Sequence, residues 1–235
     1  MNEKHISSRF DADLRDVSNR VLEMGGLAES QVVLAMRSLA HMDGDEAAHV
    51  LLQEERVNQM EVEIDGALQR IIAMRQPAAV DLRLLIAVSK AIANLERVGD
   101  EAARIARTVQ RLIDTGVSSR LRMPAADLSH ESDLAIAQLR RSLDAFARLD
   151  AVQALEVLKH DDQIDQEFDG LLRKLITYMM EDPRTISSSL DLVFVAKAIE
   201  RVGDHAKNLA EATIYVVKGT DVRHHTVADV ENVVR

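Results

Sequence analysis

The chain has 235 residues and a formal net charge of −10, and its length allows one large domain or two small ones. Its acidic balance argues against a nucleic-acid-binding protein, because such a protein normally carries a basic surface. The absence of cysteine excludes disulfides, thiolate metal sites and cysteine nucleophiles. Apolar residues make up 47% of the chain, aromatic residues only 3%, and there are only three prolines. This composition favours an all-α fold with an aliphatic core.

Turn and cap residues divide the chain into six long helical segments with short connections. Asp43 or Asp45 is expected to cap the second segment, and Pro77 to occupy the first turn of the third. Long antiparallel helices with short turns predict helical bundles. The predicted helices cover residues 11–40, 46–75, 77–114, 124–150, 151–180 and 182–218. A loop is expected at 115–123, and the residues after 220 form a polar tail with a weak helical pattern near its end.

The chain shows no segment that would target or anchor it to a membrane. Residues Met1 to His5 contain no apolar signal-peptide core. The most apolar stretch, Leu192 to Ile199, is interrupted by Lys197 and is far shorter than the roughly 20 residues of a membrane span. We therefore expect a cytoplasmic protein that meets a membrane only through its partners.

A five-residue string, Glu96 to Asp100, recurs as Glu200 to Asp204 at an offset of 104 residues. The same offset aligns the second and third helices of one half with those of the other, whereas the turns at Asp43 and Asp150 lie at a different offset. Two copies of a helix triplet predict two tandem three-helix bundles, six long antiparallel helices related by a pseudo-twofold axis. The predicted units are residues 1–116 and 117–220, followed by a polar tail at 221–235.

Each half carries two pairs of acidic residues spaced four apart, one pair on its second helix and one on its third. At about 100° per residue, the members of a pair lie about 40° apart around the helix and share a face. Two such pairs on neighbouring helices would gather carboxylates, which are oxygen ligands for hard or borderline cations. Gly99 and Gly203, inside the repeated strings, are expected to let a neighbouring helix come close. The candidate metal ligands are Glu61, Asp65, Glu96, Asp100, Asp165, Asp169, Glu200 and Asp204.

Other interpretations of these residues stay open. Acidic clusters also occur in structural ion-pair networks, and Arg97 and Arg201 could pair with the carboxylates. A di-metal carboxylate oxidoreductase of the di-iron type would need a His three residues after a Glu, and neither string has one. His205 has no counterpart in the first half, which suggests a surface histidine. The chain has no phosphate-binding glycine loop or nucleophile elbow, so we expect no enzyme activity.

Together with the doubled acidic string, several further stretches resemble the PhoU family, bacterial and archaeal regulators of phosphate uptake. The resemblance extends from His5 to about His224, and the tail beyond His225 matches poorly. Because these stretches occur together, they are far more specific than Glu-x-x-x-Asp alone. They are Met24–Gly26, Arg75–Pro77 followed by Asp81–Arg83, Asp144–Arg148, Tyr178–Asp182, and Tyr215–Gly219 followed by Arg223–His224.

The resemblance implies two three-helix bundles whose Glu/Asp-x-x-x-Asp motifs bind metal, as iron or zinc clusters in some members. For this chain the expected cofactor is a divalent or iron-type transition metal, one of Fe, Zn, Mn, Ni or Mg. The implied role is a negative regulator of phosphate uptake and of the phosphate-starvation response. It would act as an adaptor between the ATPase subunit of the phosphate ABC transporter and a sensor histidine kinase. We further expect a homodimer; the alternatives are a metal-buffering protein and a di-metal carboxylate oxidoreductase.

Overall fold

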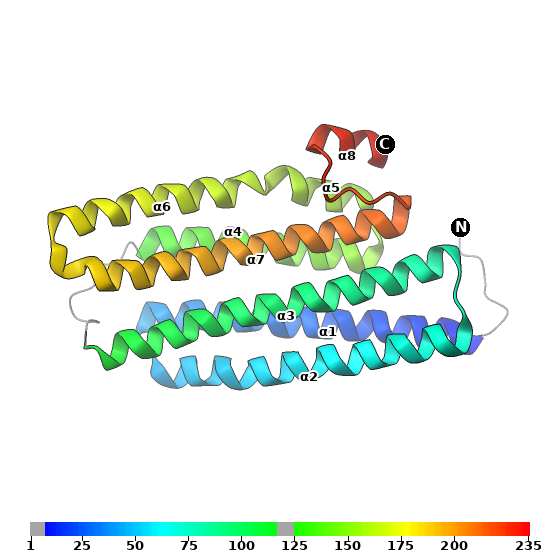
Figure 1. The fold of residues 1–235 in the computed structure, drawn as a ribbon, viewed down its shortest axis with the longest axis horizontal. Helices are drawn as coiled ribbons and strands as arrows, with labels where there is room; N and C mark the ends of the chain where they lie inside the picture. The colour runs from blue at the N-terminus through cyan, green and yellow to red at the C-terminus, as the bar shows by residue number, and fades with distance from the viewer. Residues whose placement is uncertain (1–7, 117–124) are drawn as a thin grey trace.

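Figure 1 shows the computed structural model of the chain, which describes residues 8–116 and 125–235. The first half contains α1 (Ser8–His41), α2 (Gly44–Arg75) and α3 (Ala79–Asp114). The second half contains α4 (Ala125–Arg148), α5 (Ala151–His160), α6 (Asp162–Glu181) and α7 (Ile186–Lys218). A short 3-10 turn, η2 (Pro183–Thr185), joins α6 to α7, and α8 (Val227–Val234) lies near the C-terminus.

The helices form two three-helix bundles that lie side by side along their length (Figure 1). In one bundle α1, α2 and α3 pack together, and in the other α4 and the α5–α6 pair pack against α7. The bundles meet where α3 runs along α7 and where α1 touches α4. The predicted all-helical fold of two tandem three-helix bundles is confirmed. The predicted boundary after residue 116 and most of the loop predicted at 115–123 fall on residues 117–124, outside the described residues, as do residues 1–7.

The two bundles share one hydrophobic core. On α3, Leu85, Ile92 and Leu95 recur at helical spacing and are at most 2% exposed. From the other half, α7 adds Leu192 and Val202 to the same core. Each fully buried Leu or Ile side chain contributes about 2 kcal/mol relative to an exposed one. Because α3 and α7 are buried towards both bundles, the interface between the bundles is part of the core.

The turns that open α2 and α5 have the same geometry in the two halves. Each of Asp43 and Asp150 accepts hydrogen bonds of 2.9 and 3.0 Å from the backbone N–H groups two and three residues ahead. The residue before each cap has a φ of 50°. These caps lie 107 residues apart, whereas the repeated acidic strings lie 104 apart. The second half therefore has three residues fewer between its cap and its acidic string.

The helix predicted over residues 151–180 is interrupted at Asp161, which separates α5 from α6. There the N–H of Ile164 donates to the carbonyl of Asp161 at 3.1 Å, the bond of a tighter 3-10 turn. Removing three residues from a continuous helix would rotate all that follows by about 60°. The interruption falls in the segment that is three residues short, and it allows α6 to keep Ile164 and Leu171 in the core. The prediction of one continuous fifth helix is wrong for this reason.

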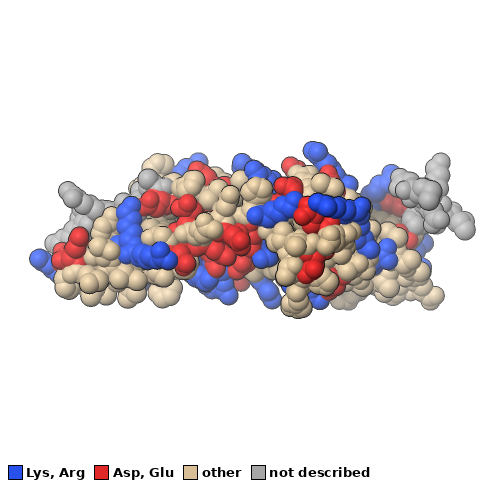
Figure 2. Space-filling view, turned by 90° about the horizontal axis from the view of Figure 1, so that it is seen from above, with Lys and Arg blue, Asp and Glu red and all other residues tan. Residues whose placement is uncertain are grey.

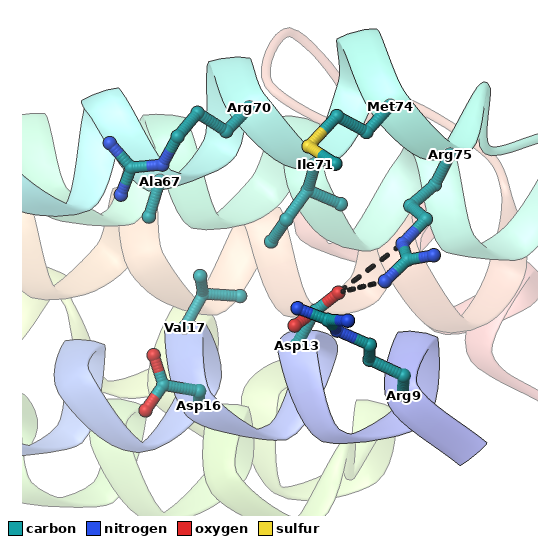
Figure 3. A pocket seen from close by; sticks show the side chains of 9 residues that line it. All are labelled: Arg9, Asp13, Asp16, Val17, Ala67, Arg70, Ile71, Met74 and Arg75. Atoms are coloured by element: carbon teal, nitrogen blue, oxygen red, sulfur yellow. Dashed lines mark hydrogen bonds and ion pairs between the residues drawn. The ribbon is translucent and has the colours of Figure 1, made fainter. Parts of the chain in front are cut away.

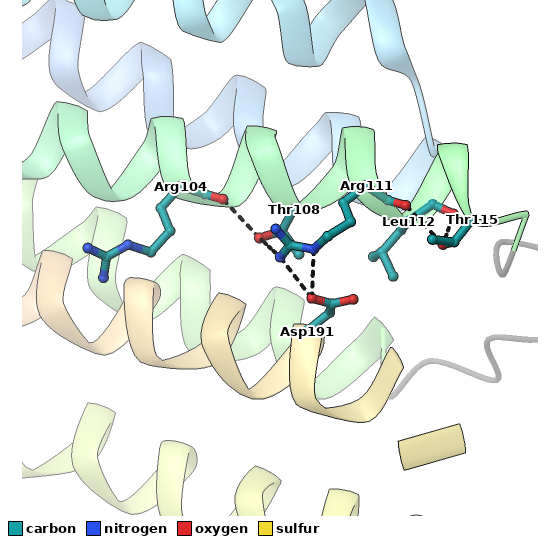
Figure 4. A network of polar contacts seen from close by, with 6 residues as sticks. All are labelled: Arg104, Thr108, Arg111, Leu112, Thr115 and Asp191. Atoms are coloured by element: carbon teal, nitrogen blue, oxygen red, sulfur yellow. Dashed lines mark hydrogen bonds and ion pairs between the residues drawn. The ribbon is translucent and has the colours of Figure 1, made fainter. Parts of the chain in front are cut away.

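A polar network ties the end of α3 to the start of α7 (Figure 4). The guanidinium of Arg111 donates through Nε and Nη2 to Asp191 Oδ1, at 3.0 and 2.8 Å. The same Nη2 donates to the hydroxyl of Thr108 at 3.2 Å. Arg111 is about half exposed, so the ion pair contributes at most about 1 kcal/mol. It links the two helices along which the bundles meet.

The C-terminal tail packs more closely than its predicted polar character suggests. Thr226 caps α8 in a capping box with Asp229. Val222, Val230 and Val234 are buried in a small second core that α5 shares. The amphipathic pattern of only eight residues was too short to predict this packing.

The most apolar stretch of the sequence, residues 192–199, lies within α7 and is not a membrane segment. Leu192, Val195 and Ile199 are buried in the bundle core. Within residues 8–116 and 125–235, no helix combines the length and the apolar character needed to cross a membrane.

Candidate functional site

The structure brings the four candidate ligands of the first half together as one group, the first acidic cluster (Glu61, Asp65, Glu96 and Asp100). All four are partly buried. Burial raises the pKa of Glu61, and Asp65 on its own helix and Asp100 on α3 raise it further. Burial is also the main cause that raises the pKa of Glu96, and the charges of Asp100 and then Glu61 raise it further. The carboxylates of α2 and α3 therefore face each other, as the spacing predicted.

The glycines of the repeated strings lie against side chains of neighbouring helices. A Cβ at Gly99 would stand 3.1 Å from Gln31 Oε1 and 3.3 Å from Val57 Cγ1. A Cβ at Gly203 would stand 2.7 Å from Ile164 Cδ1. A side chain at either position would force the neighbouring side chains to shift, in agreement with the predicted close approach. The approach holds the flanking carboxylates of α3 and α7 next to those of the preceding helix.

The corresponding group in the second half is the second acidic cluster (Asp161, Asp165, Glu200 and Asp204). Burial raises the pKa of Asp165, and Asp161 and Glu200 add to the increase. Burial is the main cause that raises the pKa of Asp204, and the charges of Glu200, Asp161 and Asp165 raise it further. Asp169 is exposed on α6 and is not among the groups that act on Asp165 or Asp204. Asp161, one turn before Asp165, stands in the cluster in its place. Figure 2 shows acidic side chains gathered on a face of the molecule, with Lys and Arg around them.

Basic groups engage the two clusters differently. In the second cluster, Lys197 Nζ lies 2.5 Å from Glu200 Oε1, and Lys207 Nζ lies 2.6 Å from Asp161 Oδ2. In the first, Arg97 lowers the pKa of Glu61 but is exposed. Of the two arginines that could pair with the motif carboxylates, Arg97 acts on Glu61. Arg201 instead pairs with Glu101, outside the motif carboxylates.

Arg201 crosses between the bundles instead. Its Nη1 donates to Oε1 of Glu101 on α3 at 3.1 Å, and Arg104 Nη1 lies 3.0 Å from the other oxygen of Glu101. Glu101 is only 4% exposed. Its counterpart at the 104-residue offset is His205, which also lies at this junction. The repeated string therefore also helps to join the bundles.

His205 is not the surface histidine that the sequence suggested. Its Nδ1 lies 3.1 Å from Asn94 Oδ1 across the bundle interface. Burial, with Arg97 and Arg201 nearby, lowers the pKa of His205 to about 4. The imidazole is therefore neutral at physiological pH and belongs to the interface, because α3 and α7 close over it.

One further carboxyl group, Glu131 on α4, was missed by the sequence analysis. It is 0% exposed, and neither of its carboxylate oxygens has a hydrogen-bond partner among the described residues. Burial, with Glu200 and Glu167 nearby, raises its pKa to about 8. One feature of the sequence could have indicated that Glu131 is buried. The 107-residue offset between the caps pairs it with Met24, an apolar core position of α1.

The donor set of the clusters suits a hard or borderline cation, since it consists of carboxylate oxygens. In the described part of the chain, no three His, Asp or Glu side chains stand close enough together, as they are, to hold a metal ion. Around the second cluster, Glu200 Oε2 and both oxygens of Glu131 are buried and have no hydrogen-bond partner among residues 8–116 and 125–235. In the first cluster, by contrast, Asp65 Oδ2 already accepts a 2.7 Å hydrogen bond from Gln69. The second cluster therefore combines a buried acceptor oxygen that has no partner among the described residues with two carboxylates that Lys197 and Lys207 already neutralise.

A separate pocket of about 200 Å³ opens between α1 and α2 (Figure 3). Three arginines line it, and one of them, Arg75, donates to Asp13 at 3.0 and 3.3 Å. None of the candidate ligands lines this pocket. It is thus distinct from both acidic clusters.

A model of the PhoU domain family matches the chain twice, over residues 21–109 and 128–213. The chain belongs to the PhoU family. The two matches coincide with the two bundles, so each three-helix unit is one PhoU domain. The acidic string Glu96 to Asp100 lies within the first matched segment, and Glu200 to Asp204 lies within the second.

Individual PhoU proteins are similar to this chain over nearly its whole length. A phosphate-specific transport system accessory protein PhoU homolog of a Burkholderia species is 50% identical over 224 residues, 95% of each chain. The crystal structure of PhoU from Pseudomonas aeruginosa matches with a TM-score of 0.85 and 44% identity, covering 90% of this chain and all of the other. The phosphate transport system regulatory protein PhoU of Streptococcus pneumoniae has a TM-score of 0.83 at 27% identity, over 91% and 99% of the two chains.

Proposed function

We propose that this chain is a cytoplasmic negative regulator of phosphate uptake and of the phosphate-starvation response. It acts as an adaptor that contacts the ATPase subunit of the phosphate ABC transporter and a sensor histidine kinase when phosphate is plentiful. The observation that carries the proposal is the 50% identity, over nearly the whole chain, to an accessory protein of the phosphate-specific transport system. The regulatory name of the streptococcal PhoU supports it.

The architecture suits an adaptor. Long helices joined by short turns present rigid faces, and helix faces are a common means of protein recognition. A net charge of −10 favours partners with basic patches and disfavours nucleic acid. No enzymatic step is part of this proposal.

A deletion strain with a phosphate-responsive reporter tests the regulatory role. At high phosphate we expect the reporter to be active in the deletion strain and silent when the gene is restored. Normal phosphate-responsive expression without the gene would contradict the role. Co-purification from cells at high phosphate should recover the transporter ATPase and the kinase, and recovery of neither would exclude the adaptor.

The proposal includes cation binding at the two acidic clusters. The ligands would be the predicted carboxylates that lie in the clusters, all of the eight except Asp169, together with Asp161. The cation would be a divalent or iron-type metal such as Fe, Zn, Mn, Ni or Mg. Oε2 of Glu200, which is buried and has no hydrogen-bond partner in the described part of the chain, supports this part. A thermal-shift titration with each cation should raise Tm in the wild type, with a smaller rise in Glu200→Ala/Asp204→Ala. No shift with any cation would refute cation binding and leave the regulatory role standing.

We also include homodimerisation through α7. Ile186, Leu190 and Phe194 are spaced four apart on this helix and are 42–57% exposed. Such a stripe is an apolar face that a second copy can cover by the same contact from both sides. Sedimentation should give a dimer for the wild type and a monomer for Phe194→Glu. The control is Val62→Glu, at a more exposed apolar position on α2. A monomeric wild type would refute this part.

A metal-buffering protein is the second candidate function, and the same unpartnered carboxyl oxygens favour it. Cellular metal content that changes on deletion, with unchanged phosphate-responsive expression, would favour buffering over regulation.

A further inference from the structure

We infer that the pocket between α1 and α2 binds a phosphate group, carried either by inorganic phosphate or by a small phosphate ester. This pocket has a volume of about 200 Å³ and lies outside both acidic clusters (Figure 3). The inference deepens the proposed function, because it gives a regulator of phosphate uptake a site for a phosphate-type signal. The choice of signal rests on that function, whereas the binding itself is argued from the residues of the pocket.

The pocket has an apolar floor and a charged rim. Val17 of α1 and Ala67 and Ile71 of α2 are buried and form the floor (Figure 3). Three arginines and two aspartates line the rim, which gives it a net charge of +1 in a chain whose net charge is −10. A positive recess in an acidic protein favours an anion over a cation. The rim residues are Arg9, Asp13 and Asp16 of α1 with Arg70 and Arg75 of α2.

The three guanidinium groups of the rim are engaged differently. Arg75 donates through Nε and Nη2 to a single oxygen of Asp13, at 3.3 and 3.0 Å. Arg9 and Arg70 have no hydrogen bond or ion pair with any of residues 8–116 and 125–235. Figure 3 shows Arg70 at one end of the pocket and Arg9 beside Arg75 at the other. Each helix therefore offers one unpaired guanidinium to the space between them.

The placement of these groups favours a phosphate over a carboxylate. A carboxylate has two oxygens in one plane, and a single guanidinium fork satisfies both. A phosphate group has tetrahedral oxygens and a charge of about −1.5 to −2 at pH 7, so it can accept hydrogen bonds from opposite sides at once. Arg9 and Arg70 are exposed and can turn towards such a group. The apolar floor leaves room for a small organic part, so we expect an ester to bind more tightly than the free ion.

The second bundle fills the equivalent positions. At the offset of 104 residues, Ala67 corresponds to Leu171 and Arg70 to Lys174. Leu171 is 3% exposed and belongs to the core, where it has three more carbon atoms than the alanine of the first bundle. Lys174 is paired with Asp127 of α4. The first bundle thus differs by a small residue in the floor and by an arginine without a partner, the two features that the site needs.

Asp16 provides a test that separates an anion site from a cation site. It lines the pocket from α1 and reduces the positive charge there. Asp16→Asn should therefore tighten phosphate binding, by about threefold to tenfold. The matched control is Glu55→Gln on the exposed face of α2, which changes the net charge of the chain equally but lies outside the pocket. Weaker binding by Asp16→Asn would contradict an anion site.

The binding assay is a ³¹P NMR titration of the full chain with inorganic phosphate and with phenyl phosphate. EDTA is present so that no metal ion bridges phosphate to the acidic clusters, and chloride at about 0.15 M screens weak attraction to exposed charges. We expect saturable binding of one phosphate group per chain. Equal Kd values for the two probes would assign the site to inorganic phosphate, and a tighter phenyl phosphate would assign it to a phosphate ester. Either result supports the site.

Three variants place the binding in the pocket. Arg9→Gln and Arg70→Gln should each weaken it by about tenfold or more, because each removes a charged donor. Arg15→Gln, an exposed arginine of α1 outside the pocket, is the matched control and should change Kd by less than about twofold. Ala67→Leu, which copies the second bundle, should abolish binding of phenyl phosphate. Its thermal unfolding is measured alongside, and the two arginine variants decide the matter if its bundle is disturbed.

Two results would overturn the inference. One is no saturable binding of either probe up to about 10 mM, a concentration at which a site with a Kd of about 1 mM would be nearly full. The other is an equal effect of Arg70→Gln and Arg15→Gln, which would show attraction to the surface as a whole. Because these readouts measure binding alone, normal phosphate-responsive expression in the deletion strain would refute the proposed function and leave the site standing.

Discussion

Replacing Glu131 by Gln is expected to remove a large part of the pH dependence of stability in the metal-free protein. The pKa of Glu131 is raised from its ordinary value of 4.5 to about 8 by burial, with Glu200 and Glu167 adding to the increase. A raised carboxyl pKa gives stability that is fully present below pH 4.5 and is lost as the pH rises towards 8, because the unfolded chain releases the proton first. At about 1.4 kcal/mol per pH unit, the wild type loses about 3 kcal/mol by pH 7.

Urea unfolding in EDTA at pH 5, 6, 7 and 8 measures this loss. The free energy of unfolding of Glu131→Gln minus that of the wild type should grow with pH by about 3 kcal/mol between pH 5 and pH 7–8. The control is Glu55→Gln on the exposed face of α2, for which the difference should stay constant. A Glu131→Gln difference that changes by less than about 0.5 kcal/mol over this range would refute the assignment of Glu131 as a buried, unpaired acid.

Two further substitutions test the packing around the repeated strings. Arg201→Ala should lower the free energy of unfolding by about 1–3 kcal/mol, because it removes a partner from buried Glu101, whereas Arg97→Ala at the equivalent exposed position should change it by less than about 0.5 kcal/mol. Equal effects of the two arginines would contradict the bundle-joining role. Gly203→Ala should destabilise by about 1 kcal/mol or more, because its Cβ would overlap a core side chain, and Gly170→Ala, with open space around it, should stabilise by about 0.5–1 kcal/mol. Urea unfolding measures both, and a stabilising Gly203→Ala would show that the helices are not in close contact there.

The candidate site was predictable to the extent that it depends on helix periodicity. The four-residue spacing placed Glu96 and Asp100 on one face, and the repeat assigned them the correct neighbours on α2. Asp169 was assigned to the second cluster by the same offset, whereas Asp161 stands there instead. The four-residue spacing could not reveal this. The segment before α6 is three residues shorter than its counterpart, and the helix breaks at Asp161 without a Gly or Pro that would mark the break in the sequence.

The sequence by itself determined most of the helices, their duplication and the resemblance to a family, since each of these follows from local periodicity and from strings of residues. Only the tertiary structure decided which polar side chains are buried. Glu131 and Glu101 look like ordinary surface acids in sequence, yet they are at most 4% exposed because α4 and α3 each pack on more than one side. Burial of this kind depends on contacts between helices that are distant in the sequence, such as α4 with α7 and α3 with α7. At His205 and Asn94 the residues in contact are more than 100 positions apart, and no local pattern encodes such contacts.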